Sequence, residues 1–129
     1  PYPGVPELLD RLRAAGVRTA VVSNKFDGAV KGLCQTYFGG RVEVAIGESQ
    51  GVARKPAPDT VFRALAELGV PPEGAVYIGD SDVDIQTAGN AGLPCISVSW
   101  GFRDEAFLTE HGAVTIADTR EELAELLLK

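Results

Sequence analysis

Short apolar runs alternate with amphipathic segments along nearly the whole chain, and this alternation most constrains the fold. Runs rich in Val, Ile and Ala follow segments in which apolar residues recur with helical spacing. This pattern predicts parallel βαβ units, because helices must cover both faces of a parallel sheet. We therefore expect an α/β protein with three layers (αβα), in which a parallel sheet lies between two layers of helices. The expected helices are residues 5–16, 27–38, 56–69, 82–92, 104–112 and 119–129, and the expected strands are 17–24, 42–47, 74–79, 94–100 and 113–117.

The expected helices also carry boundary signals. Gly69 and Gly92 follow the last apolar positions of two of them, where glycine commonly ends a helix. Thr119 and Glu122 have the spacing of a capping box at the start of the last helix. In residues 56–69 the expected buried face consists of Val61, Phe62, Leu65 and Leu68.

Length and charge exclude several classes of protein. The chain has 129 residues, which suits one domain covering residues 1–129, and it has no internal repeat or linker. A net charge of −6, spread along the chain, argues against a nucleic acid as partner. No apolar run approaches the roughly 18 residues of a membrane span, and the first residues do not resemble a signal peptide.

The cysteines and the histidine point to no site of their own. Cys34 and Cys95 lie far apart without a C-x-x-C pattern, which favours two thiols in a reducing, cytoplasmic compartment. His111 precedes a glycine, and we interpret it as a helix-end residue rather than a catalyst.

Polar residues gather where three loops are expected to open on one edge of the sheet. The run "VVSN" ends in Ser23 and Asn24, and "RKPAPD" brings Lys55 to the start of a helix. The run "YIGDSDVD" carries three carboxylates. In open parallel sheets the reactive loops follow the carboxyl ends of the strands. A hydroxyl, an ammonium group and carboxylates would therefore converge there.

The acidic loop is the most informative of the three. Phosphoryl transfer requires positive charge around the transferred oxygens, which Mg²⁺ and lysine supply. Mg²⁺ prefers oxygen ligands and usually takes one or two carboxylates. Asp80 at the strand tip is the expected ligand, and Asp84, one helical turn later, can face the same point. Asp82 lies between them and is expected to point elsewhere.

Each of these features also has a structural interpretation. Asp80 and Asp82 could be an N-cap and a first-turn residue, since acidic residues favour helix N-termini. Ser23 with Asn24 could form a turn, and Lys55 could be a solvated surface lysine. The occurrence of all three together, in this order, favours a functional site.

The segments "AVVSNK", "RKPAPD" and "YIGDSDVDIQTAGNAGLPCISVSWGF" resemble the second, third and fourth motifs of the haloacid dehalogenase superfamily, in particular its phosphoglycolate phosphatase-like members. The resemblance implies a Rossmann-like core. It implies that Ser23 hydrogen-bonds the transferring phosphoryl group, with Asn24 beside it, and that Lys55 holds that group and the attacking carboxylate. It further implies that Asp80 ligates Mg²⁺ and that Asp84 supports the metal shell.

The chain departs from this family at its first motif, D-x-D-G-T, which supplies the nucleophilic aspartate. The nearest letters, "KFDGAV", follow the second motif and lack the first aspartate, so Asp27 is no substitute. The cap domain between the first and second motifs is also missing. The resemblance therefore implies the C-terminal part of a core. It implies a missing strand between those that end at Ser23 and Asp80, to be supplied by an N-terminal segment or by a second copy.

The expected function is hydrolysis of a small phosphorylated metabolite by the complete protein, with Mg²⁺ and an aspartyl-phosphate intermediate. The favoured substrate is 2-phosphoglycolate, and the chain alone is expected to be inactive. A phosphomutase or a pyrophosphatase of the same fold remains an alternative, as does a non-catalytic module that binds phosphate and Mg²⁺. A receiver-type signalling domain is disfavoured, because it needs an acidic pair near its first strand and this chain begins with a helix.

Overall fold

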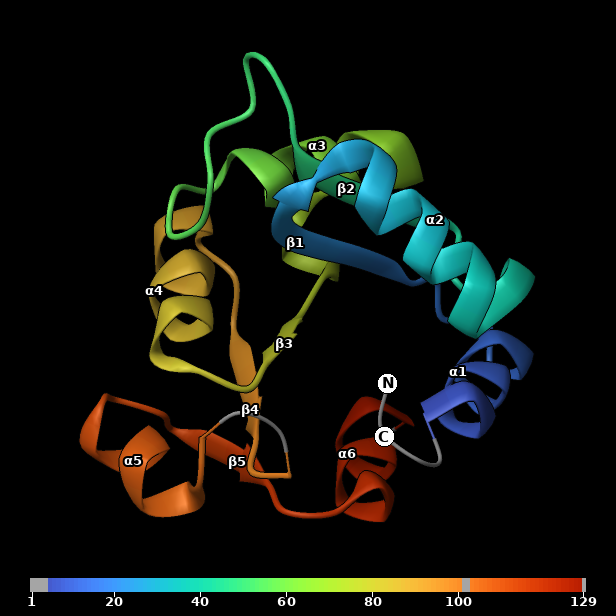
Figure 1. The fold of residues 1–129 in the computed structure, drawn as a ribbon. Coiled ribbons are helices and arrows are strands. Elements are labelled where there is room, and N and C mark those ends of the chain that lie inside the picture. The colour runs from blue at the N-terminus through green and yellow to red at the C-terminus, as the bar shows by residue number, and fades with distance from the viewer. Residues whose placement is uncertain (1–4, 101–102, 129) are drawn as a thin grey trace.

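The computed structural model describes residues 5–100 and 103–128, and helices alternate with strands as the sequence predicts (Figure 1). The helices are α1 (Val5–Ala14), α2 (Asp27–Phe38), α3 (Asp59–Leu68), α4 (Asp82–Ala91), α5 (Glu105–Glu110) and α6 (Arg120–Leu128), with short 3-10 turns at Gly39–Arg41 and Pro72–Gly74. The strands are β1 (Ala20–Phe26), β2 (Val44–Glu48), β3 (Tyr77–Gly79), β4 (Cys95–Val98) and β5 (Thr115–Ala117). No helix in these two ranges is long and apolar enough to cross a membrane.

The strands pair in parallel, which confirms the α/β class, and they form two separate sheets. One sheet has the order β1-β2 and the other the order β3-β4-β5 (Figure 1). Within the described ranges, β1 pairs only with β2, and β3 pairs only with β4. The expectation that β1 and β3 do not pair with each other is confirmed.

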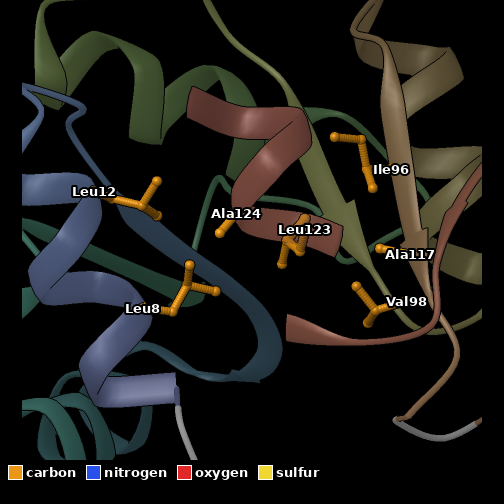
Figure 2. Packing of buried hydrophobic residues seen from close by; sticks show 7 residues of the cluster. All are labelled: Leu8, Leu12, Ile96, Val98, Ala117, Leu123 and Ala124. Atoms are coloured by element: carbon orange, nitrogen blue, oxygen red, sulfur yellow. The ribbon is translucent and has the colours of Figure 1, made fainter. Parts of the chain in front are cut away.

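Two apolar clusters hold the elements together. Figure 2 shows the first, in which side chains of α1 and α6 face those of β4 and β5. The second joins α3, β3 and α4, and Val22 of β1 packs against it, so that it connects the two sheets. The first cluster consists of Leu8, Leu12, Ile96, Val98, Ala117, Leu123 and Ala124, and the second of Val61, Leu65, Tyr77, Ala88, Ala91 and Leu93.

Two predictions about individual residues need correction. The first strand does not end at Asn24 but continues to Phe26, and its register with β2 is irregular between Val22 and Phe26. Phe62 is not part of the buried face of α3, since it is 47% exposed. The buried face of that helix includes Thr60 and Ala64. Because this face is centred away from Phe62, the Phe62 side chain lies toward solvent.

The boundary signals predicted at Gly69, Gly92 and Thr119 depend on local geometry and are confirmed, whereas α3 begins at Asp59 and not at residue 56. Gly69 and Gly92 follow α3 and α4 with φ of 71° and 76°, a left-handed conformation that favours glycine. At α6 the Glu122 N–H donates to Thr119 Oγ1 at 3.1 Å. His111 is the C-cap of α5, as predicted, and both cysteines are free thiols.

Candidate functional site

The centre of the candidate site is the carboxylate of Asp84, in the first turn of α4. Asp84 is only 6% exposed, yet its oxygens have several donors. Lys55 Nζ and the Tyr77 hydroxyl each lie 2.8 Å from Oδ1. The Asp80 N–H and the Ser81 hydroxyl donate to Oδ2 at 3.0 and 3.2 Å. Both oxygens of this buried carboxylate are therefore engaged by the protein itself.

The environment of Asp84 keeps it ionised. Burial is the largest single effect and by itself would raise the pKa of Asp84, while the hydrogen bond and charge of Lys55 are the main effects that lower it. Hydrogen bonds from Tyr77 and from the Asp80 N–H lower the pKa further, so that it lies below its ordinary value. Burial, followed by the charge of Asp84, raises the pKa of Tyr77 well above its ordinary range, so its hydroxyl stays protonated.

Glycine at position 79 permits the close approach of β3 to α4. A Cβ atom built on Gly79 would lie 2.2 Å from the Asp84 Cβ and 2.6 Å from its Oδ2. Neither distance is compatible with an ordinary van der Waals contact. The sequence "IGD" thus places the end of the strand directly against the carboxylate that organises the site.

The loop that carries Lys55 is held from two directions. Asn24, within β1, accepts the Lys55 N–H at 2.6 Å, and its own amide lies 3.4 Å from the Lys55 carbonyl oxygen. Asn90 of α4 donates to the Pro56 carbonyl at 2.8 Å. Ser23 Oγ accepts the Lys25 N–H at 3.2 Å. Asn24 therefore acts as a link between β1 and the lysine loop.

Asp80 lies between β3 and Ser81, the N-cap residue of α4. Its carbonyl accepts the Arg103 N–H at 3.2 Å, which ties the loop to the segment after β4. The Arg103 guanidinium lies 4.3 Å above the ring of Phe107. Asp80 is thus anchored through its backbone N–H and C=O, and it is not the N-cap of the following helix.

The structure joins four of the five predicted site residues through hydrogen bonds. Asn24 contacts Lys55, Lys55 contacts Asp84, and Asp84 contacts the backbone of Asp80. Ser23 is the neighbour of Asn24 on β1, and its convergence with Lys55 and Asp80 on one phosphate stays a prediction.

Sequence reasoning missed Tyr77 and Ser81. Tyr77 stands in the apolar run "GAVYIG", where an aromatic residue is expected to serve packing alone. The available signal was the period of a strand, which places Tyr77 on the same face as Gly79 and hence toward the acidic loop. Ser81 lies inside the acidic motif, but its contact with Asp84 depends on how the loop turns.

The residues fit a magnesium ion only in part. Within residues 5–100 and 103–128, no group of three or more His, Cys, Asp or Glu side chains is arranged to hold a metal ion. Both oxygens of Asp84 already accept hydrogen bonds, and the role of Asp80 at the end of β3 as a metal ligand stays a prediction. Mg²⁺ is often bound by one or two carboxylates together with substrate phosphate and water. The part of the chain that the structure describes therefore holds no complete metal centre by itself.

A hollow of about 320 Å³ lies away from this network. It is bounded by α4, β4 and the segment before β5, and its walls include none of the five predicted site residues. Its lining is mostly apolar. The polar network is therefore distinct from this hollow.

Comparison with known proteins gives the family. The model of the family described as "haloacid dehalogenase-like hydrolase" matches residues 1–92. This chain belongs to that family. A 49% identical candidate phosphoglycolate phosphatase from Lactobacillus delbrueckii subsp. bulgaricus has a solved structure that superimposes with a TM-score of 0.97 over 99% of this chain and 54% of its own.

Two further relatives are similar to this haloacid dehalogenase-like hydrolase over most of its length. Phosphoglycolate phosphatase of Aquifex aeolicus is 34% identical over 79% of this chain and 48% of its own length. A crystal structure of CbbY from Rhodobacter sphaeroides in complex with phosphate is 35% identical, with a TM-score of 0.75, and covers 94% of this chain and 55% of its own. The chain spans about half the length of the curated relatives it matches.

Proposed function

We propose that this chain is the C-terminal part of the core of a phosphatase that hydrolyses small phosphomonoesters, with 2-phosphoglycolate as the first candidate substrate. The observation that carries the proposal is the network of Lys55, Asp84 and the Asp80 backbone at the ends of parallel strands. Support also comes from relatives named phosphoglycolate phosphatase that match most of the chain.

In this proposal Lys55 is the main source of positive charge within the chain. A lysine ammonium has three N–H donors. Asp84 and Tyr77 lie within reach of two of them, at 2.8 and 3.4 Å, and the third would meet an oxygen of the phosphoryl group. Ser23 and Asn24 would contribute a hydroxyl and an amide. Charge aimed at the phosphoryl oxygens stabilises the transition state of phosphoryl transfer.

The proposed metal ligand of this chain is Asp80. Bound Mg²⁺ would supply charge neutralisation at the phosphoryl oxygens. Asp84 would act on the site indirectly, because it accepts the Asp80 N–H and thereby sets where that loop lies. We propose no direct contact between Asp84 and the metal, since both of its oxygens already have donors.

The nucleophile would come from outside this sequence. The motif D-x-D-G-T does not occur in the chain, so a carboxylate from another segment would attack phosphorus and the bond to the leaving oxygen would break. Water would then release inorganic phosphate from the acyl phosphate. A strand from the same segment, or from a second copy, would pair with β1 and β3.

The test is an assay of the complete protein encoded by the gene. We expect phosphate release from 2-phosphoglycolate with Mg²⁺, little release with EDTA, and a loss of activity in the Lys55→Met variant. Transfer of phosphate to another sugar position would identify a phosphomutase, and release from pyrophosphate alone would identify a pyrophosphatase. Binding of phosphate without turnover of any substrate would overturn the proposal in favour of a binding module.

A further inference from the structure

Tyr77 forms a closed ring of polar contacts with the two charged residues of the site. Its hydroxyl lies 2.8 Å from Asp84 Oδ1 and 3.4 Å from Lys55 Nζ. Lys55 Nζ in turn lies 2.8 Å from the same Oδ1. Tyr77 is 6% exposed, so water has little access to its hydroxyl.

The chemistry of the three groups determines the direction of each hydrogen bond. An ammonium only donates, an ionised carboxylate only accepts, and a phenol can do both. The Tyr77 hydroxyl must therefore donate its hydrogen bond to Asp84 and accept a hydrogen bond from Lys55. Burial and the charge of Asp84 raise the pKa of Tyr77, which keeps that proton in place.

The ring of Tyr77 is a rigid support for these contacts. It belongs to the apolar cluster that joins α3, β3 and α4, where it packs with Val61, Leu65 and Ala88. The lysine side chain, in contrast, has four rotatable bonds and several rotamers of similar energy. The buried phenol is thus more constrained by packing than the flexible side chain whose ammonium group it contacts.

Packing alone does not require the hydroxyl. Phenylalanine would fill nearly the same volume, and a buried hydroxyl is unfavourable unless it is hydrogen-bonded. Both partners of the Tyr77 hydroxyl are charged residues of the candidate site, from the lysine loop and from α4. The hydroxyl therefore acts on the site and not only on the core.

We propose that Tyr77 is a positioning residue whose hydroxyl holds the Lys55 ammonium against Asp84 and directs its remaining N–H toward the phosphoryl group. The nature of the bound group rests on the proposed function. The position of Lys55 does not, and it can be measured without any turnover.

The first experiment measures the reactivity of Lys55 in the complete protein. Lysines are acetylated with limiting acetic anhydride and quantified by mass spectrometry, with exposed Lys25 as the internal reference. We expect Tyr77→Phe to raise the ratio of Lys55 to Lys25 labelling several-fold. The matched control is Tyr37→Phe, because Tyr37 is 48% exposed on α2, and it should leave the ratio unchanged.

The reactivity of a buried thiol serves as a control that distinguishes loss of Lys55 positioning from loss of folding. Cys34 is 8% exposed and belongs to α2, so its reaction with a thiol reagent reports unfolding of the N-terminal sheet region. The inference predicts faster labelling of Lys55 with unchanged labelling of Cys34. If Lys55 labelling is unchanged in Tyr77→Phe, or rises only together with that of Cys34, the inference is wrong.

The second experiment connects the position of Lys55 to the reaction. In the complete protein we expect Tyr77→Phe to lower kcat by about tenfold with a smaller change in KM. Displacement of a catalytic group by about 1 Å can lower the reaction rate by up to about a hundredfold. Unchanged kcat would overturn the role in the reaction. Absence of activity in the unmodified protein would refute the proposed function, while the labelling result would still decide the position of Lys55.

Discussion

The buried pair of Lys55 and Asp84 leads to a quantitative prediction. Their side chains are 15% and 8% exposed, so Lys55→Met leaves a carboxylate buried without its cation. Removal of one partner of a buried pair costs about 3–5 kcal/mol. Asp84 keeps donors from Tyr77, Ser81 and the Asp80 N–H, which favours the lower end, about 3 kcal/mol.

A second lysine provides the matched control. Lys31 pairs with Asp27 four residues earlier on α2, but these side chains are 51% and 34% exposed. Surface pairs at this spacing contribute about 0.3–0.5 kcal/mol. Lys31→Met should therefore cost much less than Lys55→Met. The assay is urea unfolding of the complete protein, followed by far-UV circular dichroism and extrapolated linearly to water.

The pH dependence of the same variant tests the cause. The pKa of Asp84 is lowered in the folded protein, so its contribution is present above the unfolded pKa of about 3.9 and is lost as pH falls through the folded value. Without Lys55 the burial of Asp84 remains while the largest lowering effect is removed. The stability difference between wild type and Lys55→Met should then shrink as pH falls below about 4. Equal costs for the two lysine variants, or a difference that does not change between pH 6 and pH 3, would refute this reasoning.

Three further predictions concern the strand ends and the sheet edges. Gly79→Ala should destabilise the complete protein by about 1–3 kcal/mol in the same urea assay, because its Cβ would overlap Asp84, whereas Gly32→Ala within α2 has open space and should be neutral or stabilising. In calorimetric titrations Asp80→Asn should weaken Mg²⁺ binding more than Asp82→Asn, and equal losses would show that the roles are misassigned. The isolated 129-residue chain should release no phosphate from phosphomonoesters and should self-associate in sedimentation experiments, because the described residues leave one edge of β1 and one edge of β3 unpaired. Robust Mg²⁺-dependent hydrolysis by the isolated chain would contradict the first of these two expectations, and a stable monomer would contradict the second.

The order and type of the elements could be predicted from the sequence, because they depend on short-range periodicity. Residues 27–38 form α2 with the predicted bounds, and the glycines after α3 and α4 end those helices as expected. The Thr119 cap is equally local, since donor and acceptor lie within one turn. Backbone geometry alone relates such residues, so no knowledge of distant segments is needed.

The tertiary structure alone decided how the predicted site residues contact one another. Lys55 and Asp84 are 29 positions apart, and Asn24 and Lys55 are 31 apart, so packing of separate elements sets their distances. The same packing turned Phe62 toward solvent and placed the Tyr77 hydroxyl between two charges. A pattern of residue types states which chemical groups a loop carries. Only the burial of Asp84 among its donors makes it an organiser of that loop, since desolvation and hydrogen bonding act through space and not along the chain.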